Sequence, residues 1–257
     1  MSTELRDVAE RAARAAGELL RERFVAGGER ETASKSTPTD PVSEADRAAE
    51  RAIRDVIGRA RPDDAILGEE GGETQEGAGL RWIVDPLDGT VNFLYGVPQW
   101  CVSVAVHDDE GGLAGVVFDP MRDEIFTGSR DDGPPTLNGA PVRGSKQSEL
   151  SRTLVATGFA YDASVRELQA AVVGRLLPRA RDVRRMGSAA LDLAWTAAGR
   201  YDAFYERGVQ LWDIAAGSVL CAAAGLEVRP LEAVEAAPSG VLVAPPGLID
   251  ELAAIVV

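Results

Sequence analysis

The sequence is short of the residues on which several classes of enzyme depend. It contains one histidine, His107, and two cysteines, Cys101 and Cys221. A single histidine argues against histidine triads and phosphohistidine chemistry, and we expect it to be structural. The cysteines lie far apart and form no Cys-x-x-Cys pair, which argues against a zinc site. We expect both to be reduced, buried thiols.

Long apolar runs and phosphate-binding glycine motifs are also absent. No uninterrupted apolar stretch is long enough to span a bilayer, and the charged first ten residues lack the apolar core of a secretory signal. Neither Gly-x-x-x-x-Gly-Lys-Ser/Thr nor Gly-x-Gly-x-x-Gly occurs, which argues against a P-loop hydrolase or a dinucleotide-dependent dehydrogenase. We therefore expect a cytoplasmic protein that does not associate with membranes.

Positive charge is scarce. The 257 residues include 27 Lys and Arg against 41 Asp and Glu, a formal net charge of −14. This excess repels nucleic acid and anionic membrane, so we expect neither as a partner. An anionic substrate would need local positive charge, which bound cations could supply. The length suits one large domain or two small ones.

The first half of the chain predicts two helices beside an antiparallel sheet. Apolar residues between Leu5 and Leu20 recur at helical spacing, and a second helix is expected to begin near Ser43. Strands then follow without helices between them, which is typical of an antiparallel sheet. These strands cover residues 82–84, 101–106, 116–118 and 124–127.

Strands and helices alternate in the second half, as in an α/β arrangement. The expected strands cover residues 153–156, 183–185, 201–205 and 241–244. The expected helices cover residues 163–177, 188–198, 214–224 and the C-terminal end. A polar, turn-rich stretch at 138–148 predicts a boundary between an N-terminal part, 1–145, and a C-terminal part, 146–257.

Acidic side chains occur in three segments where predicted elements end: Gly68-Glu69-Glu70, Asp85-Pro86-Leu87-Asp88-Gly89-Thr90 and Trp212-Asp213. Each has a structural alternative: a solvated loop at 69–70, a turn at 88–89 and a helix cap at 213. Similarly, Asp46 fits a capping box with Ser43.

The dense segment 85–90 favours a shared site, because it presents two carboxylates and several backbone N–H groups together. A carboxylate-only set suits Mg²⁺ or Mn²⁺ rather than zinc. Two such ions can hold a phosphate, stabilise the leaving oxygen and lower the pKa of a bound water. Backbone N–H groups at a helix start bind phosphate. The pattern indicates metal-assisted phosphoryl transfer.

Two longer motifs resemble the signatures of the inositol monophosphatase family. The first is Trp82-Ile83-Val84-Asp85-Pro86-Leu87-Asp88-Gly89-Thr90-Val91-Asn92-Phe93, and the second is Trp212-Asp213-Ile214-Ala215-Ala216-Gly217. Shorter matches occur in the family's order at 40–46, 68–70, 119–121 and 137–139. The resemblance covers nearly the whole chain.

The resemblance implies a complete site. The metal ligands would be Glu69, Asp85, the carbonyl of Leu87, Asp88 and Asp213, with Mg²⁺ as cofactor and Mn²⁺ as an alternative. Glu69 and Thr90 would activate the attacking water, with Asp85 as a further catalytic residue. Substrate contacts would come from Asp88, Gly89, Thr90, Ser188, Ala189, Glu206 and Asp213. Asp46, Glu70 and Lys35 would lie around these groups, Lys35 in a loop over the site.

Two assignments stay open at this point. Glu206 fits a polyol-binding residue and an exposed charge at a strand end equally well. Arg184 and Arg185 fit either the site or a subunit interface.

The resemblance also implies a fold, an oligomeric state and a reaction. The fold would be an α/β, αβαβα layered sandwich, and the protein a lithium-sensitive homodimer. The reaction would be hydrolysis of a small phosphate monoester by water activated by two or three metal ions, with myo-inositol 1-phosphate as the favoured substrate. The alternatives are histidinol phosphate, fructose 1,6-bisphosphate and adenosine 3′,5′-bisphosphate. A regulatory or partner-binding protein on the same fold is the non-enzymatic alternative.

Overall fold

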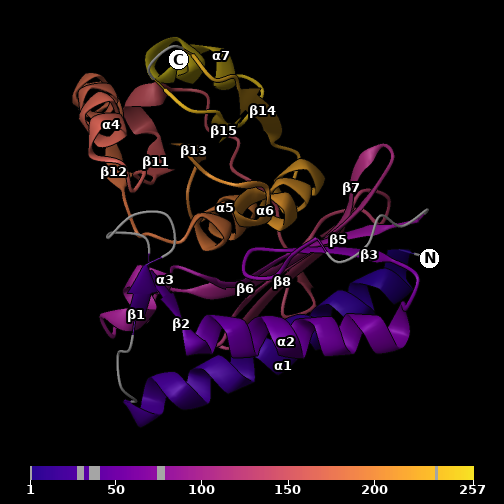
Figure 1. Ribbon diagram of the computed structural model, residues 1–257. Coiled ribbons are helices and arrows are strands. Elements are labelled where there is room, and N and C mark those ends of the chain that lie inside the picture. Colours follow the sequence, from indigo (N-terminus) through magenta and orange to yellow (C-terminus); the bar gives the residue numbers. More distant parts are fainter. Residues whose placement is uncertain (1, 28–31, 35–40, 74–78, 235–236) are drawn as a thin grey trace.

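The computed structural model describes residues 2–27, 32–34, 41–73, 79–234 and 237–257. Two helices, α1 (Ser2–Ala26) and α2 (Glu44–Ala60), pack side by side against one face of a large sheet (Figure 1). Leu5, Ala12 and Leu20 of α1 are fully buried there because they recur on one side of the helix. Both predicted helices are therefore confirmed. Strands β1 (Thr32–Ser34) and β2 (Pro41–Ser43) form a separate antiparallel pair.

The large sheet has eight strands in the order β10-β9-β8-β7-β6-β5-β3-β4. All neighbours are antiparallel except β3 and β5. The strands are β3 (Ala65–Gly68), β4 (Gly72–Glu73), β5 (Arg81–Asp88), β6 (Cys101–Asp108), β7 (Gly111–Asp119), β8 (Glu124–Ser129), β9 (Thr136–Leu137) and β10 (Ala140–Pro141). The expected antiparallel sheet is confirmed. The strand expected at residues 82–84 is longer than predicted, because pairing with β6 continues past Val84 to Asp85 and resumes at Asp88 after a register shift.

Helices α5 (Ala189–Ala197) and α6 (Leu211–Ala223) cover the other face of this sheet. Two glycines permit the close packing. A Cβ on Gly115 of β7 would lie 2.5 Å from the carbonyl oxygen of Ala216 on α6. A side chain on Gly217 would likewise overlap Leu193 of α5. The position of α6, and hence of Asp213 in its first turn, depends on this contact with the sheet.

A five-stranded sheet and two outer helices complete the layers. Its order is β12-β11-β13-β15-β14, with β11 parallel to β12 and β13 and the other pairs antiparallel. The strands are β11 (Leu154–Thr157), β12 (Asp182–Arg184), β13 (Ala203–Arg207), β14 (Glu227–Leu231) and β15 (Gly240–Ala244), and α4 (Ala163–Leu176) and α7 (Ile249–Val256) lie outside them (Figure 1). Two short elements, α3 (Thr90–Leu94) and the 3₁₀ turn η1 (Leu150–Arg152), join the larger ones.

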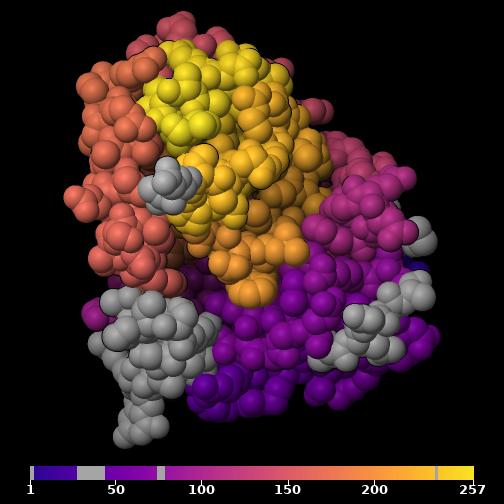
Figure 2. Space-filling view, turned by 45° about the horizontal axis from the view of Figure 1, so that its top comes forward, coloured from indigo at the N-terminus to yellow at the C-terminus, as the bar shows by residue number. Residues whose placement is uncertain are grey.

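The layers confirm the αβαβα sandwich. One core lies between α1, α2 and the large sheet, a second contains α5 and α6 with residues of both sheets, and a third lies beneath α4 and α7. In the surface view the orange and yellow C-terminal residues rest on the purple N-terminal ones (Figure 2). Cys101 and Cys221 are buried and free, as expected. Among the helices that the structure describes, none is both long enough and apolar enough to cross a membrane.

Candidate active site

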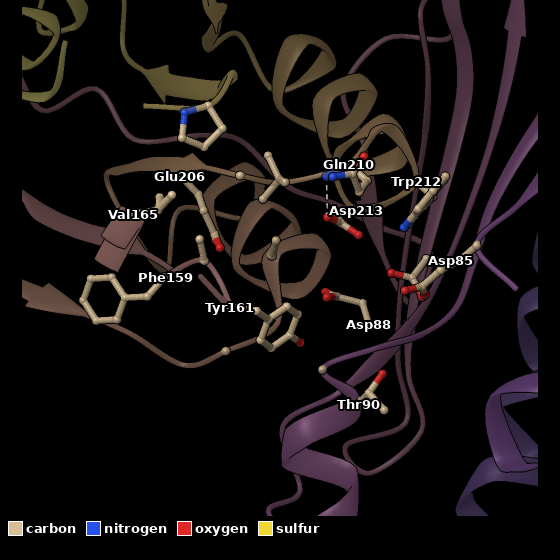
Figure 3. Close-up of a pocket in the computed structure, with 18 of the residues that line it drawn as sticks. Asp85, Asp88, Thr90, Phe159, Tyr161, Val165, Glu206, Gln210, Trp212 and Asp213 are labelled. Carbon is tan, nitrogen blue, oxygen red and sulfur yellow. Dashed lines mark hydrogen bonds between the residues drawn. The ribbon is translucent and has the colours of Figure 1, made fainter. Parts of the chain in front are cut away.

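A pocket with a volume of about 570 Å³ opens where the end of β5, the start of α5, β13 and the start of α6 come together (Figure 3). All five residues named as metal ligands line it: Glu69, Asp85, Leu87, Asp88 and Asp213. Gly89, Thr90, Ala189 and Glu206, named as catalytic or substrate-binding residues, line it too. The fold therefore brings distant acidic segments to one cavity.

The end of β5 supplies Asp85 and Asp88. The Asp85 carboxylate accepts the backbone N–H of Leu87 at 2.9 Å, which stabilises the irregular strand end. Gly89 then adopts φ +95°, and a Cβ there would lie 2.9 Å from the carbonyl oxygen of Gln99. Glycine is required at this turn by both its dihedral angle and its surroundings.

Thr90 begins α3 with its hydroxyl held between two acceptors. Its Oγ1 lies 3.1 Å from the carbonyl oxygen of Leu87 and 3.2 Å from the buried carboxylate of Asp46. Asp46 therefore contacts the site through Thr90. Neither Asp46 nor Glu70 is a pocket-lining residue, and Lys35 lies outside the described residues.

The loop that carries Glu69 is held by a residue that sequence reasoning missed. Glu50, 3% exposed on α2, accepts the backbone N–H groups of Glu70 and Gly71 at 2.7 and 2.9 Å. Arg54, one turn further along α2, donates to the same carboxylate at 2.7 Å. The spacing of Glu50 and Arg54 was a visible signal of an ion pair, but the loop contact joins segments distant in sequence.

Asp213 combines a structural role with its place in the pocket. It is the third residue of α6, and its Oδ2 accepts the backbone N–H of Gln210 at 2.6 Å within a capping box. The alternative that Asp213 is the N-cap is wrong in position, because Gln210 is the N-cap, but Asp213 does take part in capping as the third helical residue. The side chain nevertheless lines the same pocket as Asp85 and Asp88 (Figure 3).

The acidic side chains raise one another's affinity for protons. Burial raises the pKa of Asp85 well above its usual value, and the charges of Glu69, Asp88 and Asp213 add to the effect. Burial, followed by the charge of Asp88, similarly raises the pKa of Asp213. Buried like charges of this kind are stabilised by protons or by a cation.

The donor set fits a hard divalent cation, since it consists of carboxylate and carbonyl oxygens. Among the described residues, no three acidic, histidine or cysteine side chains form a complete metal site as they stand. Asp88 and Asp213 each have one oxygen engaged in a protein hydrogen bond.

The end of the pocket away from Asp85 combines a carboxyl group with an arginine and an aromatic ring. Glu206 of β13 lines it, and burial followed by the charge of Asp88 raises the pKa of Glu206 to about 8. Arg185 also lines it, with its guanidinium 5.6 Å from the ring centre of Phe159. Arg184 instead pairs with Asp182 at 2.6 Å on the exposed strand β12. Arg185 is thus the member of the pair that belongs to the pocket.

Ser188 is placed differently from the other expected substrate contacts. Its hydroxyl is buried and donates to Asp88 Oδ2 at 2.6 Å. It is not a lining residue of the pocket, whereas its neighbours Gly187 and Ala189 are. Phe159, Tyr161 and Gln210 line the pocket without having been singled out from the sequence, because no motif marked them.

Comparisons with a family model, with curated proteins and with solved structures agree on one family. A model of the inositol monophosphatase family matches residues 1–255. Inositol-1-monophosphatase SuhB of Mycobacterium tuberculosis is 42% identical, over 97% of this chain and 92% of the relative. Nus factor SuhB of Escherichia coli (strain K12) is also 42% identical, over 85% and 82%. The crystal structure of extragenic suppressor protein suhB from Bartonella henselae superposes with a TM-score of 0.88 at 34% identity, covering 97% of each chain.

Proposed function

Because the chain belongs to the inositol monophosphatase family, we propose that it is a magnesium-dependent phosphatase acting on a small phosphate monoester. The observation that carries this proposal is the convergence of Glu69, Asp85, Asp88 and Asp213 in one pocket. Evenly spread surface carboxylates would give no such concentration of buried negative charge, and an anionic substrate could not enter it without cations.

These four side chains and the carbonyl of Leu87 would hold Mg²⁺, with Mn²⁺ as an alternative. When bound, the divalent cations would offset the carboxylate charge, polarise the phosphoryl oxygens and lower the pKa of the attacking water. The same oxygens would bind less tightly those divalent ions that prefer nitrogen or sulfur ligands.

The residues around the carboxylates would position the water and the phosphate. Glu69 is suited to accept the proton of the attacking water, as a general base at the pocket wall. Thr90 would orient that water, because Asp46 and the Leu87 carbonyl hold its hydroxyl in place. Backbone N–H groups at Gly89 and Thr90 would bind phosphate oxygens.

The far end of the pocket would take the alcohol part of the substrate. Glu206 and Arg185 can bond to hydroxyl groups, while Phe159 and Tyr161 provide walls against which a ring can pack. Gly187 and Ala189 add little bulk to the pocket lining. These features support myo-inositol 1-phosphate as the substrate, with histidinol phosphate, fructose 1,6-bisphosphate and adenosine 3′,5′-bisphosphate as alternatives.

A phosphate-release panel tests the proposal. Purified protein is assayed on the four substrates with Mg²⁺ and with EDTA, beside the Asp88→Asn variant. We expect release only with Mg²⁺, fastest from inositol 1-phosphate, and loss of most activity in the variant with its circular dichroism unchanged. Full activity of Asp88→Asn, or release that EDTA does not stop, would refute the metal assignment. Faster release from another phosphate would change the substrate alone.

Two further family traits belong to the proposal: inhibition by Li⁺ and a homodimer. A light-scattering mass of one chain would exclude the dimer, and unchanged turnover in LiCl would exclude the inhibition.

The name of the Escherichia coli relative, a Nus factor, favours a second candidate: a regulatory or partner-binding role on the same fold. The two functions separate experimentally. A carboxylate variant that is inactive yet still binds a partner protein would show a role independent of catalysis. Complete inactivity of the unaltered protein on the whole panel, together with such binding, would favour the second candidate.

A further inference from the structure

We propose that Ser188 is a positioning residue that fixes Asp88 for divalent-cation binding, and that Asn92 holds the same segment of the C-terminal part in place. The inference rests on the proposed function in that it takes Asp88 as a metal ligand. It concerns how two regions distant in sequence, the end of β5 and the start of α5, are joined at the pocket.

At the start of α5, Asp88 accepts a backbone N–H that the residue before a helix ordinarily accepts. Ser188 occupies the position just before the helix, where a serine hydroxyl ordinarily accepts a backbone N–H of the first turn. Here its side chain makes no such bond. The carboxylate of Asp88 accepts the N–H of Ala190 at 2.7 Å in its place, and Ser188 donates its hydroxyl proton to the same oxygen.

The result is that Asp88 Oδ2 is held from two directions by short bonds. Cys101 adds a third, weak donor, with its sulfur 3.8 Å from that oxygen and 3.6 Å from Ser188 Oγ. The positive end of the α5 dipole favours the carboxylate at this point. Asp88 therefore has little rotational freedom, and its orientation toward the pocket is set before a ligand arrives.

Asn92 anchors the residues just ahead of Ser188. From α3 its side-chain amide donates to the carbonyl oxygen of Met186 at 2.9 Å and to that of Gln99 at 2.7 Å, with Gly187 O a more distant acceptor at 3.3 Å. Asn92 thus lies beneath the pocket wall formed by Gly187. It contacts no carboxylate in these bonds, so its loss should act on the wall rather than on Asp88.

The two side chains therefore predict separable effects. Removing an outer partner of a metal ligand typically weakens metal binding by about 10- to 100-fold. Ser188→Ala should lower the affinity for Mn²⁺ by about tenfold, because Ala190 still holds Asp88. Asn92→Ala should instead raise the KM of the substrate and leave the Mn²⁺ affinity within about threefold, as expected for the loss of neutral hydrogen bonds.

The experiment measures Mn²⁺ binding directly, by electron paramagnetic resonance of free Mn²⁺ without substrate. The proteins are the unaltered chain, Ser188→Ala, Ser188→Thr, which restores a hydroxyl, Asn92→Ala and Thr196→Val. Thr196 is the matched control, since its buried hydroxyl lies on the same helix and bonds to the Asp192 carbonyl. Ser188→Gly, an acceptable residue before a helix, replaces Ser188→Ala should that variant not fold.

We expect about tenfold weaker binding in Ser188→Ala alone. Equal affinity of Ser188→Ala and the unaltered chain would overturn the inference and leave the proposed function intact. Equal weakening in Thr196→Val, or no recovery in Ser188→Thr, would also overturn it, because the effect would then be a general loosening of α5. No Mn²⁺ binding by the unaltered chain would overturn both proposals.

Discussion

Replacing Asp85 by Asn should stabilise the metal-free protein and remove its response to Mg²⁺. Asp85 is 2% exposed, and the charges of Glu69, Asp88 and Asp213 disfavour its ionised form. Asn keeps the shape and the oxygen that accepts the Leu87 N–H. It removes a buried charge that only a cation or a proton can balance, so the unfolding temperature without metal should rise.

The stabilisation by bound metal sets the expected rise in the unfolding temperature. A ligand present at 100 times its dissociation constant stabilises the folded state by about 2.7 kcal/mol. For a chain of this size, 1 kcal/mol shifts the unfolding midpoint by roughly 2–4 °C. Saturating Mg²⁺ should therefore raise the midpoint of the unaltered protein by about 5–11 °C. Asp85→Asn should show little of this rise.

Scanning calorimetry at neutral pH, with Mg²⁺ and with EDTA, measures both effects. Asp192→Asn is the control, because Asp192 is also a buried carboxyl whose pKa is raised by burial, yet it is not a pocket-lining residue. That variant should gain stability without metal and keep the full Mg²⁺ response. A lower midpoint for metal-free Asp85→Asn together with an undiminished Mg²⁺ response would refute the reasoning.

Three further predictions concern other parts of the molecule. Glu206 has a pKa near 8 in the fold and about 4.3 in an unfolded chain, so the folded state binds its proton more tightly and loses stability as pH rises between those values. Glu206→Gln should remove this loss in metal-free thermal scans, and equal pH profiles would contradict the assignment. Gly115→Ala would press a methyl group against Ala216, and should cost about 1–3 kcal/mol in urea unfolding; an unchanged midpoint would show that α6 can move away. Burial raises the pKa of Cys101 and Cys221, so neither should react with Ellman's reagent until denaturant is added, and rapid reaction of the native protein would contradict their burial.

The spacing of apolar residues within short segments was sufficient to predict most helices and strands. The helical period between Leu5 and Leu20 and the strand–helix alternation after residue 150 describe contacts that a short segment makes with one core. Strand β14 escaped detection because its sequence, Glu227–Leu231, mixes charges with a proline. Its strand character comes from pairing with β15, a tertiary effect.

The convergence of the acidic residues was predictable only with the help of the family resemblance. Each short motif alone had a structural alternative, and the capping bond of Asp213 shows that such an alternative can hold alongside a place in the pocket. Glu50 and the bond of Ser188 to Asp88 were out of reach, because they join segments that no local pattern relates. The choice of Arg185 over Arg184 depended on where the chain runs after β12, because Arg184 is the last residue of that strand and Arg185 follows it.

The central claim is that four distant acidic side chains bind divalent cations in one pocket. Crystals grown with Mn²⁺ and measured on the manganese absorption edge test it most directly. The account predicts anomalous density enclosed by Glu69, Asp85, Asp88 and Asp213. Crystals of active protein without manganese in that pocket, or with manganese bound only elsewhere, would contradict it.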